Sequence, residues 1–151
     1  QDPEAIANWP LTLSRDGART PLPWSVDAAE AGFTVGEPWL PLGAENVARA
    51  VAAQEGDPAS LLHFTRAMIA LRKANPALRH GRLDIMRADD QCLAFRRVAE
   101  DQALTCIFNL SPTPAPWPEE VEGRGDIVAA IGDAAPGMAL PPYAALLLAQ
   151  D

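Results

Sequence analysis

The feature that most constrains this chain is a wide apolar stripe on residues 57–74. Asp57 is a suitable N-cap, Pro58 suits the first helical turn and Asn75-Pro76 ends the helix. A helix with such a stripe needs a surface that covers it, and the proline-rich segment before it is a poor candidate. The stripe recurs at helical spacing through Leu61, Leu62, Thr65, Met68, Ile69 and Arg72, flanked by Phe64 and Leu71.

Residues 1–56 are rich in proline and tryptophan. They hold six prolines and three of the four tryptophans, Trp9, Trp24 and Trp39. Because proline fixes φ and removes a backbone donor, we expect only local regular structure, such as a short helix near Asn46–Ala53. Loops of this length inside compact domains are often functional. The large tryptophan side chains indicate a packed loop.

From residue 82 the pattern changes to short β-prone runs. They predict antiparallel strands at Leu83–Arg87, Gln91–Val98, Ala103–Leu110, Asp126–Ile131 and Tyr143–Ala149. If Val98 pairs with Ala103, then Cys92 lies opposite Asn109. In that register the two cysteines, Cys92 and Cys106, point to opposite faces, so we expect free thiols. The alternating prolines between residues 112 and 118 predict an extended loop.

Charge and composition exclude several classes of protein. Twenty acidic against 12 basic residues give a net charge of -8, which disfavours nucleic acid as a partner. The longest apolar run, Met138–Ala149, is shorter than the roughly 18–20 residues of a membrane helix. No Cys-x-x-Cys pair or His/Cys cluster points to a metal, and we expect no cofactor.

The compartment is only weakly indicated. The chain begins with Gln1, and no basic and apolar leader follows, so the sequence gives no evidence of export. Unpaired cysteines and an acidic pI favour the cytoplasm, with the periplasm as the alternative.

No catalytic constellation is visible. His63 and His80 are the only histidines, and neither accompanies a nucleophile motif. The pairs Asp89-Asp90 and Glu119-Glu120 lie in predicted turns, where acidic residues are common, and we interpret them as structural. We therefore predict no catalytic residue in this chain.

Unlike these histidines and acidic pairs, the segment from Ser14 to Trp24 has a pattern of charged residues that suits a binding site. Two guanidiniums flank one carboxylate, and we predict Arg15, Asp16 and Arg19 as substrate-binding residues. In this hypothesis Asp16 holds one arginine, and the other donates hydrogen bonds to a polyol or a carboxylate. Trp24 would offer a flat face to a sugar ring. The alternative is an internal salt bridge that only braces the loop.

The run Arg15-Asp16-Gly17-Ala18-Arg19-Thr20-Pro21-Leu22-Pro23-Trp24 resembles a motif of glycoside hydrolase family 13. The resemblance is strongest to the α-glucosidase and oligo-1,6-glucosidase branch, which usually has Met where this chain has Leu22. Further similar segments are Asp2-Pro3, Trp9-Pro10, Trp39-Leu40-Pro41, the stretch from Gln54 to Leu78, and Ile107-Phe108-Asn109-Leu110-Ser111.

The resemblance implies an α+β fragment with three regions. Residues 1–56 are expected to form the long loop after the eighth strand of a (β/α)8 TIM barrel. Residues 57–80 are expected to be the last barrel helix and a linker, so that the barrel wall covers the apolar stripe. Residues 81–151 are expected to form a C-terminal antiparallel all-β sandwich domain. Barrel loops that follow strands build the active-site face.

The activity that the resemblance implies is a retaining α-glucosidase acting on short α-glucosides of the maltose or sucrose type. In this family the catalytic carboxylates come from earlier barrel strands, and no residue here matches them. The chain is therefore expected to shape the pocket rim and support the barrel, with the missing N-terminal barrel portion as its partner.

Two alternatives remain open. Trehalose synthases and sucrose isomerases of the same family carry a similar loop motif but transfer glucose rather than hydrolyse. A non-catalytic carbohydrate-binding β-sandwich module is the other, although an isolated module should not expose the apolar stripe.

Overall fold

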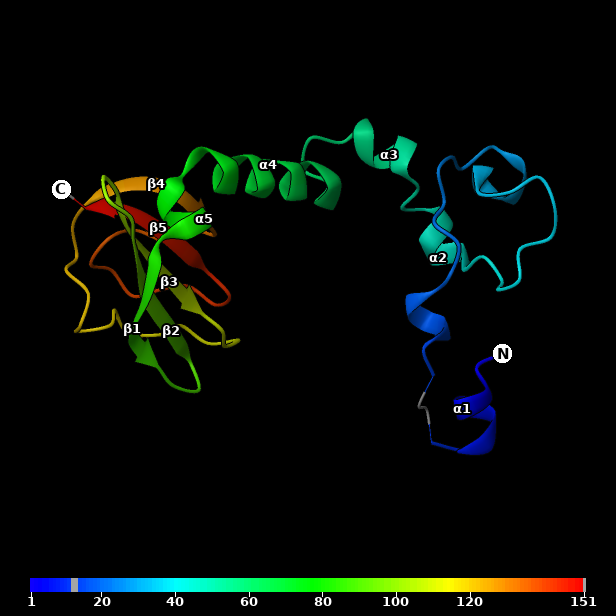
Figure 1. The fold of residues 1–151 in the computed structure, drawn as a ribbon, viewed down its shortest axis with the longest axis horizontal. Coiled ribbons are helices and arrows are strands. Elements are labelled where there is room, and N and C mark those ends of the chain that lie inside the picture. Colours follow the sequence, from blue (N-terminus) through cyan, green and yellow to red (C-terminus); the bar gives the residue numbers. More distant parts are fainter. Residues whose placement is uncertain (12–13, 151) are drawn as a thin grey trace. The chain divides into compact units, whose positions relative to one another are not determined.

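The computed structural model describes residues 1–11 and 14–150, which form two compact units (Figure 1). The first unit is Gln1–Met68, and the second begins at Ile69. Asp151, the last residue of the predicted C-terminal domain, lies outside the described residues. Among the described residues, no helix combines the length and the apolar character needed to cross a bilayer.

In its described residues, the first unit contains only short helical segments, as its prolines predict. The helix expected near Asn46–Ala53 is present as two helices, α2 and α3, because the backbone of Ala50 between them is extended (φ -53°, ψ 149°). The segments are α1 (Pro3–Ala7), the 3₁₀ turns η1 (Asp16–Ala18) and η2 (Ala29–Gly32), α2 (Ala44–Val47) and α3 (Val51–Glu55).

Helix α4 spans Leu61–Ala74, so the prediction that it begins at Asp57 and Pro58 is wrong. Asp57 instead closes a turn, because its Oδ1 accepts a hydrogen bond from the N–H of Ala59 at 2.9 Å. The N-cap role falls to Ser60. Its carbonyl accepts from the N–H of Phe64 at 3.0 Å, and its Oγ accepts from the N–H of His63 at 3.4 Å.

The apolar stripe of α4 is exposed. All residues of α4 belong to the described chain, and none of them is buried. The exposed fractions of Leu61, Phe64 and Ile69 are 71%, 43% and 49%. Large apolar side chains on one helix face are stable in water only when another surface covers them.

Asn75 and Pro76 end α4, as predicted. The chain then continues as a second short helix, α5 (Pro76–His80), in which Asn75 is the N-cap and Pro76 the first residue. His80, the last residue of the expected helix-and-linker region, is the last residue of this helix.

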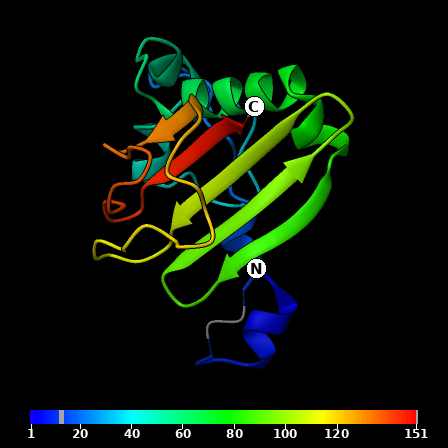
Figure 2. The same cartoon turned by 90° about the vertical axis from the view of Figure 1, so that its left-hand side faces the viewer.

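In the part of the chain that the structure describes, five strands form one antiparallel sheet in the order β1-β2-β3-β5-β4 (Figure 2). The predicted strands are all present, each within two residues of its expected bounds. Strand β5 lies between β3 and β4, so the C-terminal strand is central rather than at the edge. The strands are β1 (Arg82–Ala88), β2 (Cys92–Val98), β3 (Ala103–Asn109), β4 (Asp126–Ile131) and β5 (Ala145–Gln150).

The predicted register between β2 and β3 is confirmed. Val98 pairs with Ala103, and Cys92 pairs with Asn109. The two cysteines are therefore on opposite faces, and both are buried free thiols. Burial raises the pKa of both thiols, that of Cys106 to about 11.

One face of the sheet carries the main core. Loop segments form the layer that covers this face, and an isolated bridge between Ala115 and Leu140 joins them. The antiparallel all-β domain is thus confirmed, with its second layer built from loops. Its buried cluster combines Cys92, Ala94, Ile107, Leu146 and Leu148 of the sheet with Val121, Ala134, Leu140 and Ala144 of the loops.

Candidate functional site

The predicted site residues lie on and around the 3₁₀ turn η1. Arg15 precedes the turn and Arg19 follows it. The N–H of Ala18 donates to the carbonyl of Arg15, and the N–H of Arg19 donates to the carbonyl of Asp16, both at 3.0 Å. The turn therefore holds the two arginines at its two ends, with Asp16 between them.

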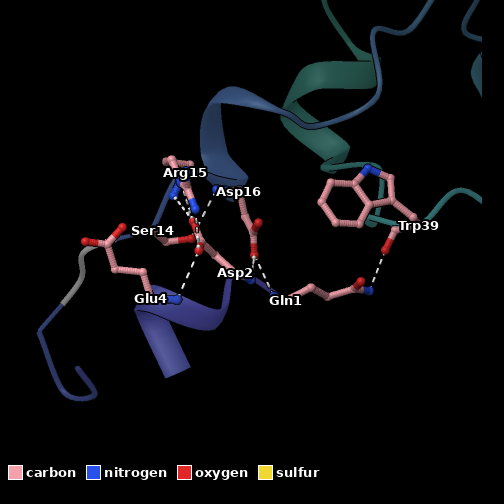
Figure 3. A network of polar contacts seen from close by, with 7 residues as sticks. All are labelled: Gln1, Asp2, Glu4, Ser14, Arg15, Asp16 and Trp39. Atoms are coloured by element: carbon pink, nitrogen blue, oxygen red, sulfur yellow. Dashed lines mark hydrogen bonds and ion pairs between the residues drawn. The ribbon is translucent and has the colours of Figure 1, made fainter. Parts of the chain in front are cut away.

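Arg15 pairs with Asp2, not with Asp16 (Figure 3). Its Nε donates to Oδ2 of Asp2 at 2.9 Å, and its Nη2 donates to Oδ1 at 3.1 Å, which is a bidentate contact. The hypothesis that Asp16 holds one of the two arginines is therefore wrong. Asp2 supplies the carboxylate from 13 residues earlier.

Asp16 accepts hydrogen bonds from backbone nitrogens instead. Its Oδ2 accepts from the nitrogen of Gln1 at 2.5 Å and from the N–H of Asp2 at 3.0 Å (Figure 3). Its Oδ1 is buried and has no hydrogen-bond partner among the described residues. The bonds to Asp16 and Asp2 together attach the first residues of the chain to the turn η1.

The electrostatics of both carboxyls follow from these donors. Hydrogen bonds from the side chain and the backbone of Arg15 hold the pKa of Asp2 far below its usual value. The same contact raises the pKa of Arg15. A hydrogen bond from the N–H of Asp2 also lowers the pKa of Asp16. Both carboxylates are therefore ionised at neutral pH.

Arg19 is the guanidinium that remains available. Its side chain is exposed. Within residues 1–11 and 14–150 it forms no ion pair. An exposed, unpaired guanidinium presents five N–H donors and suits hydroxyl or carboxylate acceptors.

The segment after Arg19 is anchored on helix α3. The carbonyls of Pro23 and Trp24 accept from the N–H groups of Val51 and Ala52 at 3.0 Å, which satisfies donors at the start of that helix. The side chain of Trp24 stays 52% exposed. The loop thus presents one cation and one indole ring on a fixed backbone.

Three of the other titratable residues, His63, Asp89 and Glu120, have structural partners. His63 is half-buried, and its Nε2 lies 3.1 Å from the carbonyl of Glu55. Asp89 accepts from the N–H of Cys92 at 2.7 Å in the turn between β1 and β2. Glu120 lies 3.9 Å from Arg87. Within the described chain, no group of three or more histidine, cysteine or acidic residues is placed to hold a metal ion.

Asp2 is the residue that analysis of the motif alone missed. It is separated from Arg15 by 13 positions, and no local pattern connects them. The only sequence feature that marks it is Asp2-Pro3, because aspartate before a proline favours the start of a helix. In the structure Asp2 is the N-cap of α1, and its Oδ1 accepts from the N–H of Glu4 at 3.1 Å.

Comparison with protein families finds two matches. The α-amylase catalytic domain matches residues 1–81. A C-terminal domain of unknown function, DUF3459, matches residues 80–147.

Curated relatives include glucosidases. A probable α-glucosidase of Rhizobium meliloti is 41% identical over 131 residues, which are 83% of this chain and 24% of that protein. A probable oligo-1,6-glucosidase of Bacillus subtilis is 36% identical over 121 residues, or 78% of this chain and 21% of that protein. The chain thus spans about a quarter of the length of these relatives.

Solved structures agree with the fold. The α-glucosyl transfer enzyme XgtA matches the whole chain with a TM-score of 0.82 and 37% identity, over 29% of its own length. Trehalulose synthase MutB from Pseudomonas mesoacidophila MX-45 matches 90% of the chain with a TM-score of 0.76 and 28% identity, over 26% of its own length.

Proposed function

Because the chain belongs to the α-amylase family of glycoside hydrolases, we propose that it is part of a retaining α-glucosidase that hydrolyses short α-glucosides of the maltose or sucrose type. The match to the catalytic domain over residues 1–81 carries this proposal. The relatives named α-glucosidase and oligo-1,6-glucosidase support it.

In this proposal residues 1–56 are the loop after the eighth barrel strand, residues 57–80 the last barrel helix with its linker, and residues 81–151 the C-terminal domain. The two family matches meet at residues 80–81, which supports the last boundary. The uncovered stripe of α4 supports a barrel as its neighbour, because the barrel wall would bury Leu61, Phe64 and Ile69. The missing N-terminal barrel portion is the partner that we propose.

The chemistry would be a double displacement through a covalent glycosyl-enzyme. It needs two carboxyl groups about 5–5.5 Å apart on either side of the glycosidic bond. We place both in the barrel portion that precedes this chain. The chain itself supplies the rim of the pocket, where Arg19 donates hydrogen bonds to the sugar on the leaving-group side.

The stereochemistry of glucose release tests the activity. Maltose, isomaltose and sucrose are given to the enzyme that contains this chain, and the first glucose released is observed by NMR. A retaining α-glucosidase releases the α-anomer first. Release of the β-anomer first, or of no glucose from any of the three, would contradict the proposal.

Arg19→Ala tests the role of this loop. Loss of a charge-assisted hydrogen bond of about 1.5–3 kcal/mol should raise KM for maltose between about 10-fold and 100-fold. Arg49→Ala is the matched control, because Arg49 is also an exposed arginine of the first unit. Unchanged kinetics of Arg19→Ala on maltose, isomaltose and sucrose would refute the role.

Glucosyl transfer is the second candidate function. The likeness to XgtA and to trehalulose synthase favours it. Hydrolysis and transfer differ in whether water or a sugar takes the glucosyl group. Chromatography of the products from maltose and sucrose separates the two: glucose as the main product indicates hydrolysis, whereas new disaccharides indicate transfer.

We also propose the cytoplasm as the compartment. Both cysteines are free thiols, and their places on opposite faces of the sheet prevent a disulfide between them. Free thiols are typical of reducing compartments.

A further inference from the structure

The carboxylate of Asp2 is saturated with hydrogen bonds. The side chain is fully buried, and each oxygen accepts two bonds. Oδ2 accepts from the backbone N–H and the Nε of Arg15 at 3.0 and 2.9 Å, and Oδ1 accepts from Nη2 of Arg15 and the N–H of Glu4, both at 3.1 Å. Three of the four donors thus belong to Arg15.

Asp2 also donates a hydrogen bond to the carboxylate of Asp16. Its N–H bonds to Oδ2 of Asp16 at 3.0 Å, while the N–H of Arg15 bonds to the carboxylate of Asp2 at 3.0 Å. The two segments therefore exchange hydrogen bonds in both directions (Figure 3). This exchange fixes the start of η1, at whose other end Arg19 stands.

We propose that Asp2 is a positioning residue: its buried carboxylate occupies Arg15 and so leaves Arg19 as the guanidinium available to the sugar. Without Asp2, the start of η1 loses its attachment and Arg15 competes with Arg19 for the same acceptors. This inference rests on the proposed α-glucosidase activity, and it assigns different tasks to the two arginines of the loop.

The test compares two substrates on the complete enzyme. Maltose and α-glucosyl fluoride deliver the same glucosyl group, but only maltose has a sugar on the leaving-group side. We expect Asp2→Asn to lower kcat/KM for maltose between about 10-fold and 100-fold, because a displaced positioning group has effects of this size. The value for α-glucosyl fluoride should change less than about threefold.

The matched control is Glu4→Gln. Glu4 lies on the same helix and is exposed, and its substitution also removes one negative charge. If Asp2→Asn lowers kcat/KM for both substrates by the same factor, Asp2 only stabilises the fold and the proposal is overturned. If the unmodified enzyme cleaves neither substrate, the glucosidase function itself has failed, which is a different outcome.

Two further measurements keep the test decisive if Asp2→Asn does not fold. Arg15→Lys keeps the charge but loses the bidentate contact. We expect it to lower the ratio of kcat/KM for maltose to kcat/KM for α-glucosyl fluoride, but by less than Asp2→Asn does. The backbone amide of residue 15 should exchange its hydrogen faster in Arg15→Lys than in the unmodified enzyme and the Glu4→Gln control. An unchanged ratio with unchanged exchange would overturn the proposal.

Discussion

Asn109 joins the end of strand β3 to two loops through its side-chain amide. It is 2% exposed. Its Nδ2 donates to the carbonyls of Thr113, Leu140 and Pro141 at 2.7, 3.2 and 2.9 Å. Its Oδ1 accepts from the N–H and Oγ of Ser111 at 2.9 and 2.8 Å. A single buried side chain thus satisfies polar groups from both of the loops it meets.

We predict that Asn109→Ala destabilises the sheet by about 3 kcal/mol, because it leaves several buried polar groups without a partner. Hydrogen exchange of the β3 amides measures this unfolding free energy directly. Gln91→Ala is the control, since Gln91 is exposed and its side chain makes one bond of 3.5 Å. Equal exchange rates in both variants would contradict the prediction.

Asp89 makes the turn between β1 and β2 sensitive to acid. Hydrogen bonds from the N–H groups of Cys92 and Gln91, and then from Arg87, lower the pKa of its carboxyl from 3.8 to about 2. A carboxyl group whose pKa is lower in the folded than in the unfolded state stabilises the fold at pH values above its unfolded pKa. This stabilisation is lost as the pH falls through the folded pKa. The stabilisation is therefore complete above about pH 4 and lost near pH 2.

We expect the protection of the Cys92 amide against hydrogen exchange to decrease as the pH falls from about 4 to about 2. Asp89→Asn should lower the protection at neutral pH and remove its dependence on pH in this range. Asp90→Asn, which removes the neighbouring exposed carboxyl, should behave like the unmodified protein. A Cys92 amide with the same protection at pH 2 and pH 5 would disprove the role of Asp89.

At the scale of elements, hydrogen bonds through the side-chain amides of Asn75 and Gln102 connect helix α4, helix α5 and the turn between β2 and β3. Nδ2 of Asn75 donates to the carbonyl of Leu71 at 2.7 Å. Nε2 of Gln102 donates to Oδ1 of Asn75 at 2.7 Å, and its Oε1 accepts from the N–H of Ala77 at 3.0 Å. These bonds satisfy a carbonyl at the end of one helix and a donor at the start of the next.

We predict that Gln102→Ala destabilises α5 by about 2 kcal/mol, because Ala77 and the buried Asn75 lose their partner. Exchange of the Ala77 amide should become about 30-fold faster, as that free energy requires. Glu100→Ala in the same turn is the control, since Glu100 is exposed. A double variant with Asn75→Ala should show a coupling energy of about 1 kcal/mol; additive effects would show that the two amides act independently.

At the scale of the whole molecule, the uncovered face of α4 decides how the chain behaves in isolation. Leu61, Phe64 and Ile69 expose large apolar surfaces on one helix side. Patches of this kind mark interaction sites or cause association in water. The same surface is the one that we propose the barrel wall covers.

We predict that residues 1–151 expressed alone associate, and that Phe64→Ser with Ile69→Ser shifts them towards the monomer. Sedimentation velocity at several concentrations measures this. Ala70→Ser is the control, because helical spacing places Ala70 opposite the stripe. A monodisperse monomer of the unmodified chain would favour a free-standing module over a part of a barrel enzyme.

The sequence by itself determined the features that depend on neighbours along the chain. The five strands, the pairing of Val98 with Ala103, and the end of α4 at Asn75-Pro76 follow from side-chain alternation and from proline geometry. The sequence does not identify where α4 begins, because both Asp57 and Ser60 are good N-caps. Only the hydrogen bonds of Ser60 to His63 and Phe64 identify which one begins the helix.

Only the tertiary structure decided which distant residues meet. The insertion of β5 between β3 and β4 and the partner of Arg15 both depend on contacts between separated segments. Asp16 is next to Arg15 in the sequence, yet Asp2 forms the ion pair with Arg15. The 3₁₀ turn directs the carboxylate of Asp16 towards the nitrogens of Gln1 and Asp2. A charge pair is set by three-dimensional geometry, and sequence distance does not determine it.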